Sequence, residues 1–116
     1  MSMSASCKIT NKTGGLIVFT NISQVNDDAT WSITPNNTSK IPDGDSCQIS
    51  MGNSSVIFAP KGVGFDATFV DSNLDTGRIY LDDPAVGKHH FTTGGNFNFN
   101  ISNPNGNSYN VIITKK

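Results

Sequence analysis

The chain has 116 residues, the usual length of one domain, and a formal net charge of −1 at pH 7. Apolar residues make up 35% and charged residues 15%, and the rest is rich in Asn, Ser, Thr and Gly, which favours short strands and turns over helices. A charge this close to zero provides no field that would attract nucleic acid or an anionic membrane. We therefore expect one all-β domain over residues 1–116, without a nucleic-acid partner.

The N-terminus and the cysteines bear on where the chain is made. Residues 1–6 have no basic n-region and no apolar h-region, so we expect a disordered tail rather than a signal peptide. No run of about 18 apolar residues follows, which predicts a soluble protein made in the cytoplasm. Cys7 and Cys47 each fall in a strand-like pattern and are expected to be two free core thiols.

Apolar and polar residues alternate in short runs along the whole chain, as they do in half-buried strands. The first two runs, 7–11 and 15–22, flank the Gly-rich segment 12–15 and predict a β-hairpin. Further runs, each bounded by Gly, Pro, Asn or Asp, occupy 31–34, 46–51, 55–59, 65–70 and 77–81. No window shows the three- and four-residue spacing of an amphipathic helix.

The most regular alternation covers 96–102 and is separated by an Asn- and Gly-rich turn from a last run at 109–114, so these two predict a second hairpin. Turns recur at the spacing expected of sandwiches. We predict a single-domain antiparallel β-sandwich of about nine or ten short strands. Its aromatic core candidates are Phe58, Phe65, Phe69, Phe97 and Phe99.

Catalytic and metal-binding patterns are missing from the sequence. His89 and His90 are the only histidines, and as neighbours in a strand they would point to opposite faces, so no catalytic triad or zinc site is predicted. Carboxylates such as those of Asp43 and Asp45 lie in loops, where Asp commonly forms turns; calcium is the alternative explanation. We expect no enzyme activity, no catalytic residue, no metal and no cofactor.

Four segments in order carry a family resemblance: Ile9 to Gly14, Trp31, Ile41 to Asp45, and Ile79 to Gly87 with its Asp-x-Pro unit. Together they resemble the aegerolysins, and within that family the small subunit of bacterial binary insecticidal crystal toxins. The pieces cover nearly the whole chain. Fungal members have Trp where Leu81 and Ala85 stand, so this chain has less aromatic surface there.

The resemblance implies a β-sandwich that binds membrane lipids, often sphingolipids, and that acts with a larger pore-forming partner protein. The positions it nominates for lipid or ligand contact are Trp31, Tyr80, Leu81, Asp82 and Pro84. The leading hypothesis is thus a membrane-lipid- or receptor-binding protein that acts outside the cell at target membranes. It would be one component of a two-part cytolytic or insecticidal toxin and would recruit its partner or form a homo-oligomer.

Two alternatives from other classes stay open at this point. Polar Asn-, Asp- and Gly-rich loops around an exposed Trp would also suit a carbohydrate-binding lectin. A self-assembling structural or adhesion module would instead use an edge strand, such as the strand that ends at Lys116, to pair with further copies of itself.

Overall fold

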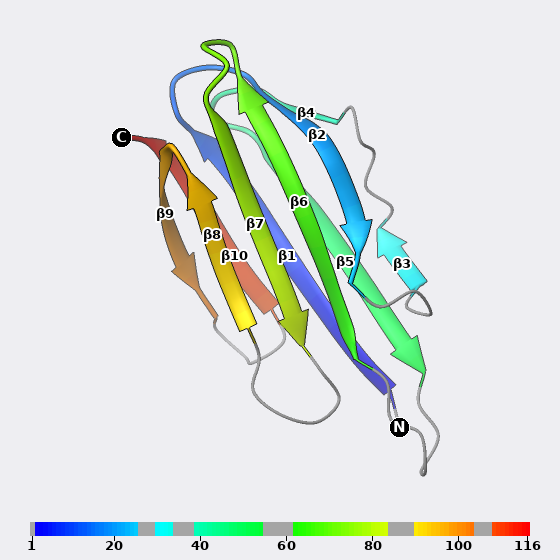
Figure 1. Ribbon diagram of the computed structural model, residues 1–116. Coiled ribbons are helices and arrows are strands. Elements are labelled where there is room, and N and C mark those ends of the chain that lie inside the picture. Colours follow the sequence, from blue (N-terminus) through cyan, green and yellow to red (C-terminus); the bar gives the residue numbers. More distant parts are fainter. Residues whose placement is uncertain (1, 26–29, 34–38, 55–61, 84–89, 104–107) are drawn as a thin grey trace.

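A computed structural model describes residues 2–25, 30–33, 39–54, 62–83, 90–103 and 108–116 (Figure 1). All regular structure in these residues is strand. The ten strands are β1 (Ser2–Lys12), β2 (Ile17–Gln24), β3 (Thr30–Ile33), β4 (Lys40–Ile41), β5 (Ser46–Ser54), β6 (Val63–Asp71), β7 (Thr76–Asp83), β8 (His90–Gly95), β9 (Phe97–Ser102) and β10 (Ser108–Lys115). The predicted all-β class and strand number are confirmed; the strand expected at 55–59, with Phe58, lies outside the described residues.

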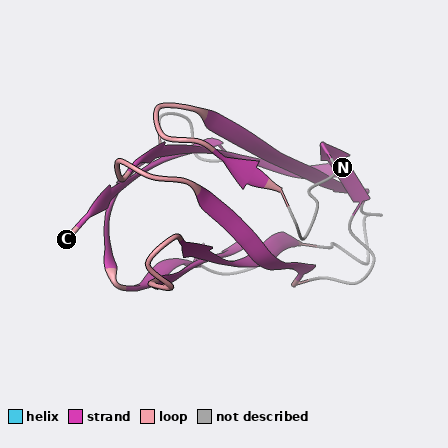
Figure 2. Cartoon of the chain, turned by 90° about the horizontal axis from the view of Figure 1, so that it is seen from above, coloured by secondary structure: helices cyan, strands magenta, loops and turns pink. Residues whose placement is uncertain are grey.

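The strands form two five-stranded sheets, in the orders β3-β5-β1-β10-β9 and β4-β2-β6-β7-β8. The sheets face one another as two layers (Figure 2). Paired strands run antiparallel except β1 and β10, which run parallel. This is the predicted β-sandwich, with one parallel pair at the centre of the first sheet.

Side chains from both sheets meet in one apolar core. Along β6 every second residue is buried, which places Phe65 and Phe69 inside. The Phe69 ring lies 5.2 Å from that of Phe97 and 6.3 Å from that of Phe19, centroid to centroid. Phe65, Phe69 and Phe97 are thus core residues as predicted, and Phe99 is half-buried against the same cluster.

The first predicted hairpin is wrong. β1 and β2 belong to different sheets, so the segment between them crosses from one layer to the other. The buried amide of Asn11 turns the chain: its Nδ2 donates to the carbonyls of Gly15 and Ile41, at 2.7 Å each, and its Oδ1 accepts from the N–H and hydroxyl of Thr13. Both strands alternate because each buries one face against the other sheet.

The expected disordered tail is also wrong. Ser2 to Ser6 continue β1 and pair with β5, and Ala5 is buried. The alternation of small and apolar residues runs on through Ala5, Cys7 and Ile9, which gives the start of the chain a core-facing side.

The strand that ends in the last lysines is not an edge strand. β10 lies between β1 and β9 in the first sheet, and its backbone groups pair on both sides. The predicted hairpin of β9 with β10 is confirmed. Because β10 is enclosed, it cannot add a strand from another copy, so the strand named as the example for the adhesion hypothesis is wrong.

Both cysteines are free thiols, Cys7 buried and Cys47 half-buried. Burial, with a smaller contribution from nearby Cys47, raises the pKa of Cys7 to about 12. Burial alone raises the pKa of Cys47 to about 11. Both side chains serve as small apolar groups at ordinary pH.

Candidate functional site

The alternation of β7 divides the predicted ligand-binding residues between two environments. Leu81 points into the core and is 0% exposed, so it presents no surface to a ligand. Tyr80 and Asp82 are half-buried and share the outer face of the second sheet with Arg78. Asp82 stands opposite His90 of β8 on the same face.

The other two predicted positions are Trp31 and Pro84. Trp31 lies in β3, in the first sheet, where its backbone is opposite Met51 of β5. Pro84 lies outside the described residues, and so does His89. Of the five predicted residues, the structure therefore brings together Tyr80 and Asp82.

A charged cluster on the outer face is centred on Arg78, which sequence reasoning missed. The guanidinium donates to Asp66 of β6 through Nε and Nη2, at 2.8 and 2.7 Å. It also lies 5.3 Å from the centre of the Tyr80 ring, at cation–π distance. The hydrogen bonds and the charge of Asp66 hold the pKa of Arg78 above its usual value, so this residue stays cationic at every physiological pH.

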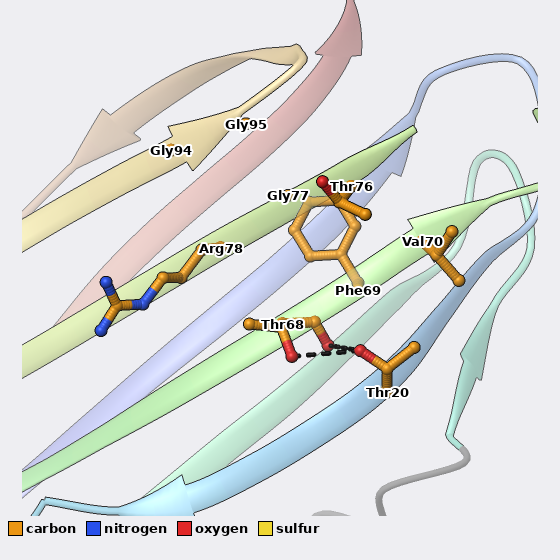
Figure 3. A pocket seen from close by; sticks show the side chains of 9 residues that line it. All are labelled: Thr20, Thr68, Phe69, Val70, Thr76, Gly77, Arg78, Gly94 and Gly95. Carbon is orange, nitrogen blue, oxygen red and sulfur yellow. Dashed lines mark hydrogen bonds between the residues drawn. The ribbon is translucent and has the colours of Figure 1, made fainter. Parts of the chain in front are cut away.

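Beside Arg78 an open groove of about 480 Å³ runs across β2, β6, β7 and β8 (Figure 3). Thr20, Thr68 and Thr76 line it, but its exposed surface is mainly apolar, and the Thr20 hydroxyl is 3.1 Å from that of Thr68. The residues that line the groove are Thr20, Thr68, Phe69, Val70, Thr76, Gly77, Arg78, Gly94 and Gly95.

A glycine of β8, Gly94, keeps the groove open. Gly94 is opposite Arg78, and a Cβ placed on Gly94 would meet no atom within 4 Å, so the groove stays open there because a side chain is absent. At Gly77 the situation is reversed, since the ring of Phe69 fills the inner side of the strand beneath it (Figure 3).

The cluster is suited to binding a polar group. Two of the five N–H groups of Arg78 donate to Asp66, which leaves three that can donate to phosphate or hydroxyl oxygens. The bidentate pair fixes the guanidinium before a ligand arrives.

Within the described residues no three His, Cys, Asp or Glu side chains gather to hold a metal ion. In the described part of the chain there is no helix long and apolar enough to cross a membrane.

Two solved structures share this architecture at low sequence identity. RahU protein, determined in complex with a TRIS molecule, is 15% identical, with a TM-score of 0.68 over 96% of this chain and 92% of that chain. IP-1A from Alcaligenes faecalis is 14% identical, with a TM-score of 0.73 over 98% of this chain and 91% of that chain. No family model matches the chain, and no curated protein matches its sequence. The likeness shows the fold alone, a β-sandwich that this chain shares with both proteins.

Proposed function

We propose that this chain is a binding protein without catalytic turnover that recognises a membrane lipid by its polar headgroup. The observation that carries the proposal is the fixed guanidinium of Arg78 at the side of an open groove with a mainly apolar lining. A headgroup offers phosphate or hydroxyl oxygens to those N–H groups, and the Tyr80 ring adds the amphipathic surface that aromatic residues provide at membrane interfaces. The resemblance of the sequence to aegerolysins supports the same ligand class, including sphingolipids.

In this proposal the chain is the membrane-recognition component of a two-part pore-forming toxin. The lipid bound in the groove concentrates the chain on the target membrane, and a larger partner, or oligomers of the chain itself, perforates the bilayer. The β-sandwich fold and the resemblance of the sequence to aegerolysins support this proposal. Dye-loaded vesicles test it, because the chain alone should bind them and release dye only after oligomerisation or addition of a partner.

Filling the groove is the sharpest test of the lipid site. Gly94→Val places a side chain into open space opposite Arg78, and a β-branched residue is well tolerated in a strand. We expect this variant to keep its melting temperature and to lose sedimentation with phosphatidylcholine vesicles that contain sphingomyelin. Arg78→Ala should lose binding in the same way.

Lys8→Ala is the matched control, since Lys8 is an exposed cation on β1 of the other sheet. Its binding should equal that of the unmodified chain. Vesicle binding that survives both Gly94→Val and Arg78→Ala would reject the groove as the lipid site.

A carbohydrate-binding function is the second candidate, favoured by the Arg78 and Asp66 pair and by the hydroxyls of Thr20 and Thr68 on the same face. Such planar charged pairs and hydroxyls match the hydroxyls of a sugar. RahU, which shares the fold, was determined with TRIS, a small amine that carries hydroxyl groups. Binding on a glycan array that free sugar displaces, without sedimentation on vesicles, would decide for this function.

A further inference from the structure

The turn between β6 and β7 carries an exposed leucine in an unfavourable backbone conformation. Leu74 has φ of 64° and is 80% exposed. Elsewhere in the described residues a positive φ occurs at Gly14, Gly44 and Gly95, where no Cβ opposes it. A leucine at this position costs free energy that Gly or Asn would avoid, and it contributes nothing to the core.

The turn is held firmly in this shape. Oδ1 of Asp71 accepts the N–H groups of Asn73 and Asp75, at 2.9 and 3.0 Å, and the N–H of Leu74 donates to the Asp71 carbonyl. Lys115 binds the other carboxylate oxygen of Asp71 and also reaches Asp75 at 3.2 Å. The leucine side chain is therefore presented to solvent by an ordered, charge-clamped turn.

A second exposed leucine lies on the adjoining turn. Leu16 is 38% exposed and follows Gly15, whose Cβ position is 3.7 Å from the Ser72 hydroxyl of the β6–β7 turn. The two turns also enclose one small cavity of about 130 Å³, lined by Thr13, Gly14, Gly15, Asp71, Ser72, Asn73 and Lys115. In Figure 1 both turns lie at the end of the sandwich that carries the C-terminus, which we call the C-terminal pole.

The charges of the pole are nearly balanced. Lys115 is paired there with Asp71 and Asp75. The charged residues near the two turns are three lysines and four aspartates: Lys12, Lys115, Lys116, Asp43, Asp45, Asp71 and Asp75. A balanced surface has no attraction for an anionic membrane or a highly charged protein, but it suits zwitterionic headgroups. The groove is continuous with the pole, because Val70 and Thr76, which line it, directly flank the turn.

We propose that Leu74 and Leu16 enter the interfacial layer of a zwitterionic bilayer and orient the domain with its C-terminal pole toward the membrane. The inference rests on the proposed lipid-binding function and adds which surface meets the bilayer. The free energy lost to the backbone of Leu74 is offset by burial of its side chain among acyl chains. In this orientation the groove opens beside the headgroup layer.

Leu74→Asn separates membrane contact from folding, since Asn adopts a positive φ readily and is polar. We expect its melting temperature to equal or exceed that of the unmodified chain, while its affinity for phosphatidylcholine–sphingomyelin–cholesterol vesicles falls about threefold to tenfold, the value of one partly buried leucine. Leu16→Ser should lower affinity in the same direction. Ile101→Ser is the matched control, because Ile101 is 40% exposed on β9 and lies outside the two turns.

Undiminished binding of Leu74→Asn to vesicles that the unmodified chain binds would overturn the orientation and leave the groove to be judged by Gly94→Val. An equal loss in Ile101→Ser would overturn it as well, because the apolar contact would then not be specific to the pole. If the unmodified chain binds none of these vesicles, the lipid-binding function and the orientation fall together.

Discussion

The ring of Phe69 occupies the space that a side chain at Gly77 would need. These residues are opposite one another in β6 and β7, and a Cβ on Gly77 would lie 2.2 Å from Cζ of Phe69. Phe69 in turn contacts the rings of Phe19, Phe97 and Phe99. The missing side chain of one strand thus allows the largest aromatic cluster of the core to pack directly beneath the groove.

Gly77→Ala should destabilise the fold by about 1–3 kcal/mol, because Phe69 must move within a tightly packed cluster. Urea unfolding measures the effect. Gly94→Ala is the control, since it adds the same methyl group on the neighbouring strand where no atom lies within 4 Å. An equal loss of stability in Gly94→Ala would show that the cost comes from replacing a strand glycine and not from displacing Phe69.

Asn11→Ala should cost about 3 kcal/mol of unfolding free energy. The substitution removes the amide that bonds Gly15, Ile41 and Thr13, and it takes a buried donor away from the Ile41 carbonyl. Asn110→Ala, on an exposed position of β10, should change stability by less than about 0.5 kcal/mol. Equal small effects in both variants would show that the corner does not depend on the Asn11 amide.

The clamp of Asp71 and Lys115 should make stability depend on pH at both extremes. The hydrogen bond from Lys115 is the largest cause that lowers the pKa of Asp71 below its ordinary 3.8. The same hydrogen bond is the largest cause that raises the pKa of Lys115 above its ordinary 10.5. A lowered carboxyl pKa stabilises the fold above pH 3.8, and this stabilisation is lost as the pH falls through the lowered value. A raised ammonium pKa stabilises below pH 10.5 and is lost as the pH rises through the raised value.

Melting temperatures of the unmodified chain and of Asp71→Asn across pH 2 to 11 measure this dependence. The two curves should be farthest apart between the two ordinary pKa values and should converge in acid and in strong base. A constant gap at every pH would mean that the clamp contributes through packing and not through charge.

The thiols should resist alkylation while the chain is folded. With pKa values of about 12 for Cys7 and about 11 for Cys47, the thiolate fraction at pH 8 is far below that of an ordinary cysteine. We expect iodoacetamide to react about a hundredfold more slowly with folded Cys47 than in urea, and more slowly still with Cys7. Mass spectrometry of the quenched protein resolves the two sites, and rapid labelling of Cys7 would contradict its burial.

Strands were predictable from the sequence because alternation is a local property, whereas strand partners depend on distant residues. The β9–β10 hairpin followed from its turn. The β1–β2 hairpin was predicted wrongly, because two alternating runs look the same whether the turn between them pairs the strands or crosses between sheets. The hydrogen bonds of the buried Asn11 amide hold the crossing.

Part of the candidate site could not be predicted from the sequence for the same reason. Asp66 meets Arg78 only through the register of β6 with β7, which no local pattern specifies. Period-two alternation does place Tyr80 and Asp82 on one face and Leu81 on the other, so the inward position of Leu81 was available from the sequence once β7 was recognised.

The parallel pairing of β1 with β10 has a kinetic consequence. Ser6 stands beside Ser108, so the first sheet joins residues 102 positions apart at its centre. Neither strand has both of its neighbours until that long loop is closed. The conformational entropy of the loop is lost before the hydrogen bonds between β1 and β10 can stabilise the sheet. We therefore expect folding on the millisecond-to-second scale of high-contact-order sandwiches, with β9 reaching its place in the first sheet only after the ends of the chain have met.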